Sequence, residues 1–77
     1  MQQNAKLLAK KINKSLDDLG VTPNIRDRAV ILGKMVHIPK PLIRAILEGQ
    51  TFPPRDVLEK IATELEIDVS QLLKSDA

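Results

Sequence analysis

The sequence predicts an all-α protein, a single compact domain of five helices that spans residues 1–77. Three observations support this class. Apolar residues recur three or four positions apart, the spacing of one face of a helix. Gly and Pro occur in the stretches between these patterns, where they indicate turns and loops. A chain of 77 residues with 43% apolar content suits one small domain, which buries about 60% of its unfolded surface.

The first two helices are predicted on either side of Gly20. The segment QNAKLLAKKINKSLDDLG carries one apolar stripe, formed by Ala5, Leu8, Ile12, Leu16 and Leu19. Gly20 is expected to end this helix because it adopts the left-handed conformation without a Cβ clash. Thr22 followed by Pro23 predicts the start of the second helix, with a hydroxyl cap and proline at the first helical position. Four residues of this helix are expected to face the core: Ile25, Ala29, Leu32 and Val36.

The fourth and fifth helices are predicted beyond a loop at residues 50–54. This stretch, QTFPP, is a loop because two successive prolines do not lie inside a helix. The fourth helix begins near Pro54 and buries one face, formed by Val57, Ile61, Ala62 and Leu65. The fifth covers IDVSQLL, with Asp68 as its cap and Gln71 as the capping-box partner.

Residues 29–48 have the spacing of a helix-turn-helix motif, in which a second short helix crosses the first through a tight turn. The second of these helices opens at Pro39 or Lys40 and runs through Leu47. Close crossing needs a very small residue, which Gly33 supplies. His37 occupies the turn position that needs a positive φ, which His tolerates at a cost. Five residues are expected to form the motif's small core: Leu32, Val36, Ile38, Ile43 and Ile46.

The composition excludes several classes of site. The chain has no Cys, which excludes a disulfide, a thiolate metal site and a cysteine nucleophile. No apolar run exceeds four residues, so we predict neither a membrane span nor a signal peptide and expect a soluble, cytoplasmic protein. His37, the single His, is interpreted as a structural turn residue, so neither a metal nor a cofactor is expected. Ser15 and Ser70 have no His partner in a defined motif, so we do not expect an enzyme.

The charges are distributed unevenly along the chain. Residues 1–55 carry ten Lys or Arg against four acids, a net charge of +6, whereas residues 56–77 carry two Lys against six acids, a net charge of −4. This asymmetry suggests one face for an anionic partner and another turned away from it. The alternative is that the charged side chains only form water-exposed helix surfaces and bind no partner. The lysines of the first helix, Asp17 and Asp18 are interpreted as solvated.

Several features follow one another between Ala29 and Leu73: LGKMV, HIPKPLIRAILEG, Pro53 and VLEKIATELEIDVSQLL. In this order they resemble the phage lambda repressor-like (XRE-type) helix-turn-helix family. Six residues match the family's LLxIAxxL helix and its final paired leucines: Leu58, Ile61, Ala62, Leu65, Leu72 and Leu73. The resemblance implies a transcriptional regulator that binds double-stranded DNA. The implied protein is a homodimeric repressor of mobile-element type, which binds a palindromic operator in the cytoplasm and is then associated with the nucleoid.

The resemblance places the groove-facing side chains on the helix near residues 40–47. There Lys40 and Arg44 can donate hydrogen bonds to guanine edges or phosphates. Pro41 and Ala45 offer only apolar contact, for example with a thymine methyl group. Glu48 is expected to be repelled by phosphates unless it accepts a hydrogen bond from cytosine. Further contacts with the DNA backbone are expected from the first helix of the motif and from the loop that follows the helix near residues 40–47. The residues are Lys34, Gln50, Thr51 and Arg55.

A second class of function is a protein–protein interaction adaptor on the same fold, with weak or lost DNA readout. Pro39 and Pro41 fall in the first turn of a helix, where a missing N–H leaves no bond unmade, so the fold is expected to survive them. They offer no side-chain hydrogen bond to a base. Five apolar residues are expected to be partly exposed, and such surface favours association: Leu7, Ile31, Met35, Leu42 and Leu47. The alternative is that these residues pack against neighbouring helices.

Overall fold

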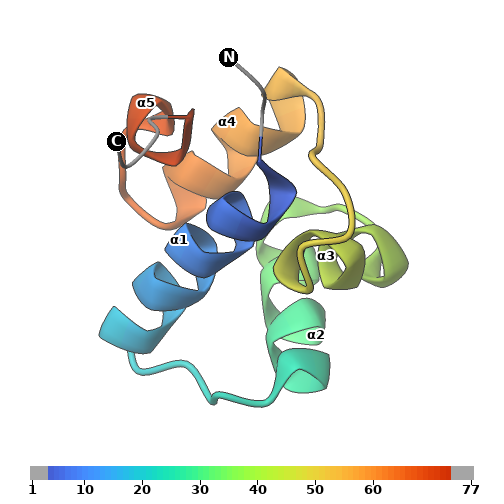
Figure 1. Cartoon of the computed structure of the whole chain (residues 1–77). Helices are drawn as coiled ribbons and strands as arrows, with labels where there is room; N and C mark the ends of the chain where they lie inside the picture. The colour runs from blue at the N-terminus through green and yellow to red at the C-terminus, as the bar shows by residue number, and fades with distance from the viewer. Residues whose placement is uncertain (1–3, 74–77) are drawn as a thin grey trace.

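Five α-helices form the protein in the computed structural model, which describes residues 4–73 (Figure 1). They are α1 (Ala5–Asp18), α2 (Ile25–Val36), α3 (Lys40–Leu47), α4 (Arg55–Glu64) and α5 (Val69–Leu73). The described residues contain no strand, so the all-α prediction is confirmed. The Cα radius of gyration is 11.2 Å, about the value expected for a compact chain of this length.

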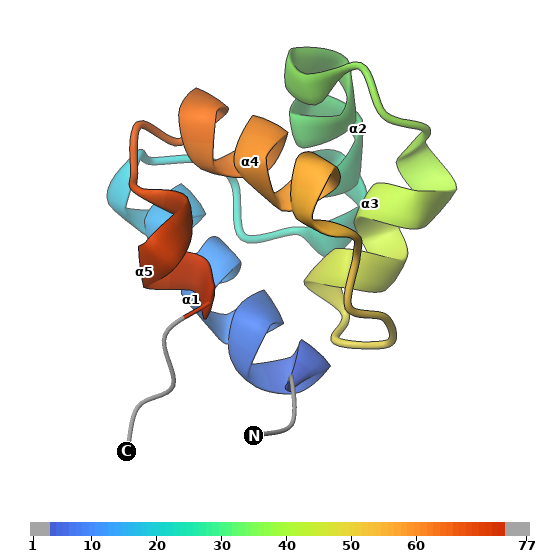
Figure 2. The same cartoon turned by 90° about the horizontal axis from the view of Figure 1, so that it is seen from above.

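The helices surround one aliphatic core. α1 packs against α3 and α5, and α4 packs against α2 and α5 (Figures 1 and 2). The largest fully buried side chains come from four helices: Leu8, Ile12, Leu16, Leu32, Ile43, Ile46, Leu58 and Ile61. Burial of each stabilises the fold by about 1.5–3 kcal/mol before entropy is counted. Phe52, the single aromatic residue, is only partly buried at the edge of this core.

The start of α2 differs from the prediction. Asn24, and not Thr22, is the N-cap, because its Oδ1 accepts hydrogen bonds from the backbone N–H groups of Arg26 and Asp27 at 2.9 and 3.2 Å. Thr22 and Pro23 therefore lie before the helix. A carboxamide oxygen satisfies the same free N–H groups as a hydroxyl, so Asn24, two residues after Thr22, caps the helix.

Several apolar residues have a different exposure from the one predicted. Leu19 is 56% exposed, because it lies beyond the last residue of α1 and no longer follows the helical period. Ile25 is half-buried. Leu47 is only 3% exposed, and its carbonyl accepts a hydrogen bond from Asn13 Nδ2 at 3.1 Å, so the end of α3 is held against α1. Of the other four residues expected at the surface, Ile31 is exposed and three are half-buried: Leu7, Met35 and Leu42.

The turn between α2 and α3 has the predicted backbone geometry. His37 adopts φ 58° and ψ 45°, the left-handed conformation, and the N–H of Ile38 donates to the carbonyl of Gly33 at 3.1 Å. A Cβ on Gly33 would lie 3.0 Å from the carbonyl oxygen of Ile38. The absence of a side chain at Gly33 therefore permits the tight approach of α3 to α2.

Arg28 ties the loop before α2 to α1. Its side chain is almost fully buried and donates to the carbonyls of Thr22 (2.6 Å) and Val21 (3.4 Å) and to Oδ1 of Asn13 (2.9 Å). It also pairs with the carboxylate of Asp17, whose side chain is 62% exposed. Asp17 is thus not merely solvated, because it neutralises a buried guanidinium. Such a charge is tolerated in the interior only when it is paired and hydrogen-bonded.

The later segments agree in part with the predicted boundaries: the fifth helix is predicted over residues 67–73, whereas α5 begins at Val69. Residues 50–54 form a loop, and Pro54 is the residue that precedes α4. Oδ1 of Asp68 accepts a hydrogen bond from the N–H of Ser70 at 3.1 Å, which confirms Asp68 as the cap of α5. No helix in the described part of the chain has both the length and the apolar content needed to cross a membrane.

Replacing Arg28 with Met is expected to destabilise the fold by about 2–3 kcal/mol, because it removes several charge-assisted hydrogen bonds and leaves their acceptors without a partner. Urea unfolding followed by circular dichroism measures this free energy. Arg26→Met, at an exposed position of the same helix, is the control and should change stability by less than about 0.5 kcal/mol. Equal effects of the two substitutions would contradict the role assigned to Arg28.

Replacing His37 with Gly is expected to stabilise the protein by roughly 0.5–1 kcal/mol, because Gly adopts the left-handed conformation without the Cβ strain that His bears. The side chain of His37 is exposed, so little packing is lost. Lys34→Gly is the control inside α2, where Gly should cost about 0.5–1 kcal/mol instead. The opposite signs should appear in thermal unfolding curves, and destabilisation by both would refute the strain at His37.

Candidate nucleic-acid interface

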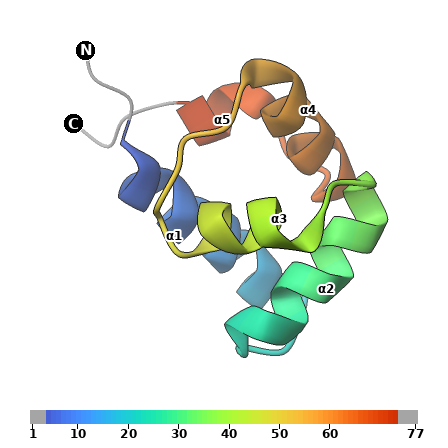
Figure 3. The same cartoon turned by 90° about the vertical axis from the view of Figure 1, so that its right-hand side faces the viewer.

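α3 presents one continuous side to the outside of the molecule. Its inner side is fully buried and formed by Ile43, Ile46 and Leu47. Its outer side follows the helical period and carries Lys40, Pro41, Arg44, Ala45 and Glu48, all of them exposed except Ala45, which is half-buried. Figure 3 looks onto this helix, with α2 and α1 beside it. The residues predicted to face a DNA groove therefore lie together on one accessible surface.

The two prolines are accommodated at the entrance of α3. Pro39 is the N-cap residue, and its carbonyl accepts hydrogen bonds from the N–H groups of Leu42 and Ile43 at 3.1 and 3.2 Å. Pro41 is the second helical residue, where a backbone N–H has no acceptor within the helix. No side chain caps this end. The helix thus tolerates both prolines, and no side chain accepts a hydrogen bond from the N–H groups of its first turn.

Lys34 and Lys40 lie on either side of the turn between α2 and α3. Both line a shallow hollow of about 270 Å³ at the crossing of α2 and α3, together with Val30, Gly33 and Ile38. Both side chains are exposed. The tight approach at Gly33 therefore places two lysines from different helices at one hollow, and Arg44 follows Lys40 one turn further along α3.

Arg44 is paired with Glu48 in this structure. The distance from Arg44 Nε to Glu48 Oε2 is 3.0 Å, and the two side chains are 47% and 30% exposed. An exposed pair of this spacing contributes only about 0.3–0.5 kcal/mol. Glu48 therefore competes weakly with any external anion for the guanidinium of Arg44, and it keeps that group on the outer side of α3.

The loop after α3 passes close to the start of α1. Gly49 has φ 74°, and a Cβ at this position would lie 3.1 Å from the Cα of Lys6. Gln50 follows and is exposed, and Thr51 is half-buried. The loop thus brings Lys6, which was interpreted as solvated from the sequence, beside the two predicted loop contacts. Sequence spacing gave no signal for this, because the two segments are far apart in the chain.

Arg55 does not join the residues of α3. It is the first residue of α4, which begins at the far end of the loop from α3 (Figure 3). Its Nε donates to Glu59 Oε2 at 3.0 Å on α4 itself. Of the eight residues predicted to contact DNA, Arg55 is therefore the one that the fold separates most clearly from the basic surface formed by Lys34, Lys40 and Arg44.

Sequence reasoning missed the Arg44–Glu48 pair and the burial of Arg28. The first had a signal, since Arg and Glu four residues apart on a helix commonly pair. The second had none, because the direction of Arg28 depends on how α1 and the loop pack around it. Within residues 4–73, no three His, Asp or Glu side chains gather closely enough to hold a metal ion.

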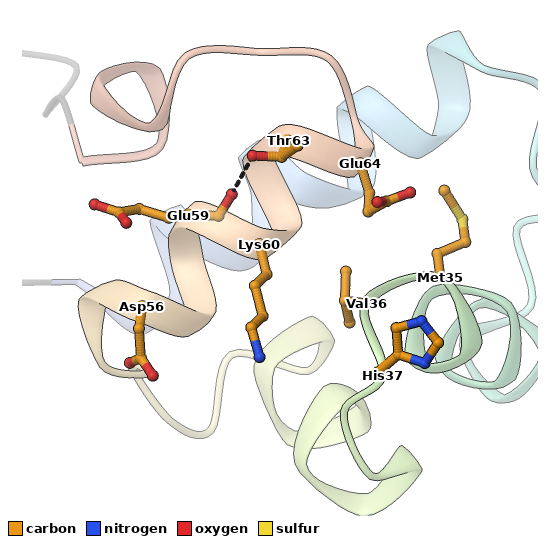
Figure 4. A pocket seen from close by; sticks show the side chains of 8 residues that line it. All are labelled: Met35, Val36, His37, Asp56, Glu59, Lys60, Thr63 and Glu64. Carbon is orange, nitrogen blue, oxygen red and sulfur yellow. Dashed lines mark hydrogen bonds between the residues drawn. The ribbon is translucent and has the colours of Figure 1, made fainter.

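A second surface feature is the α2–α4 hollow, an open depression of about 450 Å³ between the end of α2 and the outer side of α4. It is lined by Met35, Val36, His37, Asp56, Glu59, Lys60, Thr63 and Glu64. Figure 4 shows the side chain of Glu64 extending toward Met35, with Lys60 and Asp56 further along α4. Among its Asp, Glu and Lys residues, three are acidic and one is basic, in contrast to the basic surface on α3.

Comparison of the chain with protein-family models, with curated proteins and with solved structures finds no match.

Proposed function

We propose that the protein is a sequence-specific regulator of transcription that binds double-stranded DNA through α3. The supporting observation is the exposed side of α3, which carries Lys40 and Arg44 and on which Lys40 shares a hollow with Lys34 of α2. In a helix-turn-helix protein, the second helix enters the major groove and the first crosses the backbone. α2 and α3 would take these two roles, as the resemblance to the lambda repressor-like family implies.

Some of these side chains are suited to contact bases, and others are suited to contact phosphates and position the protein on the DNA. Arg44 can donate two hydrogen bonds to a guanine edge once it leaves Glu48, and Lys40 can donate to guanine or phosphate. Lys34 and Gln50, at the two ends of the surface, are suited to phosphate contacts that position the protein. Pro41 and Ala45 supply apolar contact with a thymine methyl group.

The regulator we propose is a cytoplasmic repressor that acts as a homodimer on a palindromic operator. A single short reading helix covers only a few base pairs, so two copies on two half-sites are needed for useful affinity and specificity. Occupation of a promoter-proximal site would block polymerase sterically. This mechanism requires no catalytic group and no cofactor.

The second candidate is a protein-interaction adaptor with little DNA readout. The observation that favours it is the exposure of Ile31, which is 39% exposed on α2 one turn before the half-buried Met35. Together they leave apolar surface beside the α2–α4 hollow. An adaptor predicts little affinity for duplex DNA at physiological salt, whereas a DNA reader predicts affinity that falls steeply as salt rises.

Selection of bound duplexes from a random pool at physiological salt should enrich two inverted half-sites about one helical turn apart. On the enriched duplex, Arg44→Ala should weaken binding by about 1–3 kcal/mol and relax the preference at one base position. Arg26→Ala removes the same charge at the opposite end of α2 from the turn and is the control. No enrichment by a folded protein, or equal losses in both variants, would favour the adaptor.

Replacing Glu48 with Gln should raise the affinity for non-specific duplex by roughly twofold, because it releases Arg44 from an exposed ion pair worth about 0.3–0.5 kcal/mol. The gain should shrink at high salt, where charges are screened. Glu59→Gln removes an equal charge from the Arg55 pair on α4 and is the matched control, with no gain expected. Fluorescence anisotropy with a labelled duplex measures both, and a lower affinity for Glu48→Gln would show that Glu48 does not compete with DNA.

A further inference from the structure

The α2–α4 hollow combines an apolar side with an acidic side. Met35 and Val36 line it from α2, and α4 contributes three acidic residues, Asp56, Glu59 and Glu64. The carboxylate of Glu59 points away from α2 (Figure 4). Glu59 is bound to Arg55. Asp56 and Glu64 have no ion-pair partner within residues 4–73. Lys60, which also lines the hollow (Figure 4), offsets one of these two unpaired charges, so the group keeps a net charge of −1. The hollow is thus suited to a partner that is cationic and partly apolar.

The outer side of α1 has the complementary chemistry. Leu7, Lys10 and Lys14 stand on the side of α1 opposite its buried residues. Both lysines are exposed and Leu7 is half-buried. Lys14 Nζ lies 3.9 Å from Asp18 Oδ2, and both of these side chains are largely exposed, so the pair holds the lysine only weakly. α1 therefore offers a row of ammonium groups beside one apolar side chain.

We propose that the protein associates with itself, with the outer side of α1 of one copy docking in the α2–α4 hollow of another. Lys10 and Lys14 then face Asp56 and Glu64, and Leu7 lies against Met35. Charge complementarity between the two surfaces selects a second copy of this chain as the occupant. Because the contact depends on exposed charges, it is weak and becomes weaker as salt rises.

The two surfaces lie on different sides of the molecule, which determines the kind of association. In Figure 3, α1 lies on one side of α3, and the end of α2 and α4 lie on the other. Contact between unlike surfaces is heterologous and can add further copies in the same direction. The outer side of α3 remains uncovered. This contact is independent of the proposed DNA binding and differs from the two-fold contact of a closed dimer.

Analytical ultracentrifugation tests the proposal on the free protein. The weight-average mass should rise above the 8.6 kDa of one chain as the concentration increases in roughly 0.1 M salt. It should return toward 8.6 kDa in roughly 1 M salt, where the screening length falls from about 10 Å to about 3 Å. A mass of one chain at every concentration in low salt would overturn the proposal.

Charge reversal identifies the surfaces. Lys10→Glu with Lys14→Glu should abolish association, as should Asp56→Lys with Glu64→Lys, and a mixture of these two double variants should associate again. Arg26→Glu with Arg44→Glu changes the net charge as much as the α1 variant does, lies on neither surface, and should leave association unchanged. Association of each double variant alone at the unmodified strength would overturn the assignment.

Lys60→Gln provides a test that does not depend on loss of association. It removes the one ammonium group from the α4 side of the hollow, so self-association should strengthen by roughly two- to fivefold. Circular dichroism confirms that each variant keeps its helical content. Unchanged or weaker association of folded Lys60→Gln would contradict docking of a lysine-bearing surface at this place.

Discussion

The close approach of α2 and α3 at Gly33 constrains the position of everything on the outer side of α3. The carbonyl oxygen of Ile38 lies 3.0 Å from the place where a Cβ on Gly33 would stand, and a backbone atom has little freedom to give way. A side chain at Gly33 would therefore move the turn and α3 with it. Lys34 and Lys40 would then no longer share one hollow. The left-handed residue His37 serves the same geometry, since it reverses the chain within a short turn.

A polar connection supports this arrangement from the other end of α3. The side chain of Asn13 accepts a hydrogen bond from Arg28 and donates one to the carbonyl of Leu47. One α1 side chain thus joins the loop before α2 to the last turn of α3. Among the described residues, no buried side-chain nitrogen or oxygen lacks a hydrogen-bond partner. A buried guanidinium is therefore compatible with a core this small, because each of its three nitrogens donates a hydrogen bond to an acceptor.

The sequence was sufficient for those parts of the fold that depend on local chemistry. Apolar spacing predicted five helices, and Gly33 and His37 predicted the tight turn, because both effects act within a few residues. The start of α2 was predicted wrongly because two capping side chains are close neighbours in the chain. The burial of Leu47 and Arg28 was beyond such reasoning, since each depends on side chains of α1 that lie 11 to 34 residues away in the chain.

The same distinction applies to the candidate interface. The exposure of Lys40, Pro41 and Arg44 on one side of α3 follows from helical period alone. The contact between Gly49 and Lys6, and the separation of Arg55 from α3, follow from how the loop crosses the molecule. Residue type and spacing identify which side chains are suited to bind an anion. Their grouping into one surface needs the tertiary structure.

The separation of charge between the two ends of the chain has a consequence for motion in solution. α1 to α3 carry nine Lys or Arg against three Asp or Glu, whereas residues 55–68 carry two against five, so the molecule has an electric dipole. In the field of a polyanion, such a dipole exerts a torque that turns the basic end forward before any contact forms. Productive encounters then become more frequent without a stronger final contact, and this kinetic advantage disappears first when ions are added.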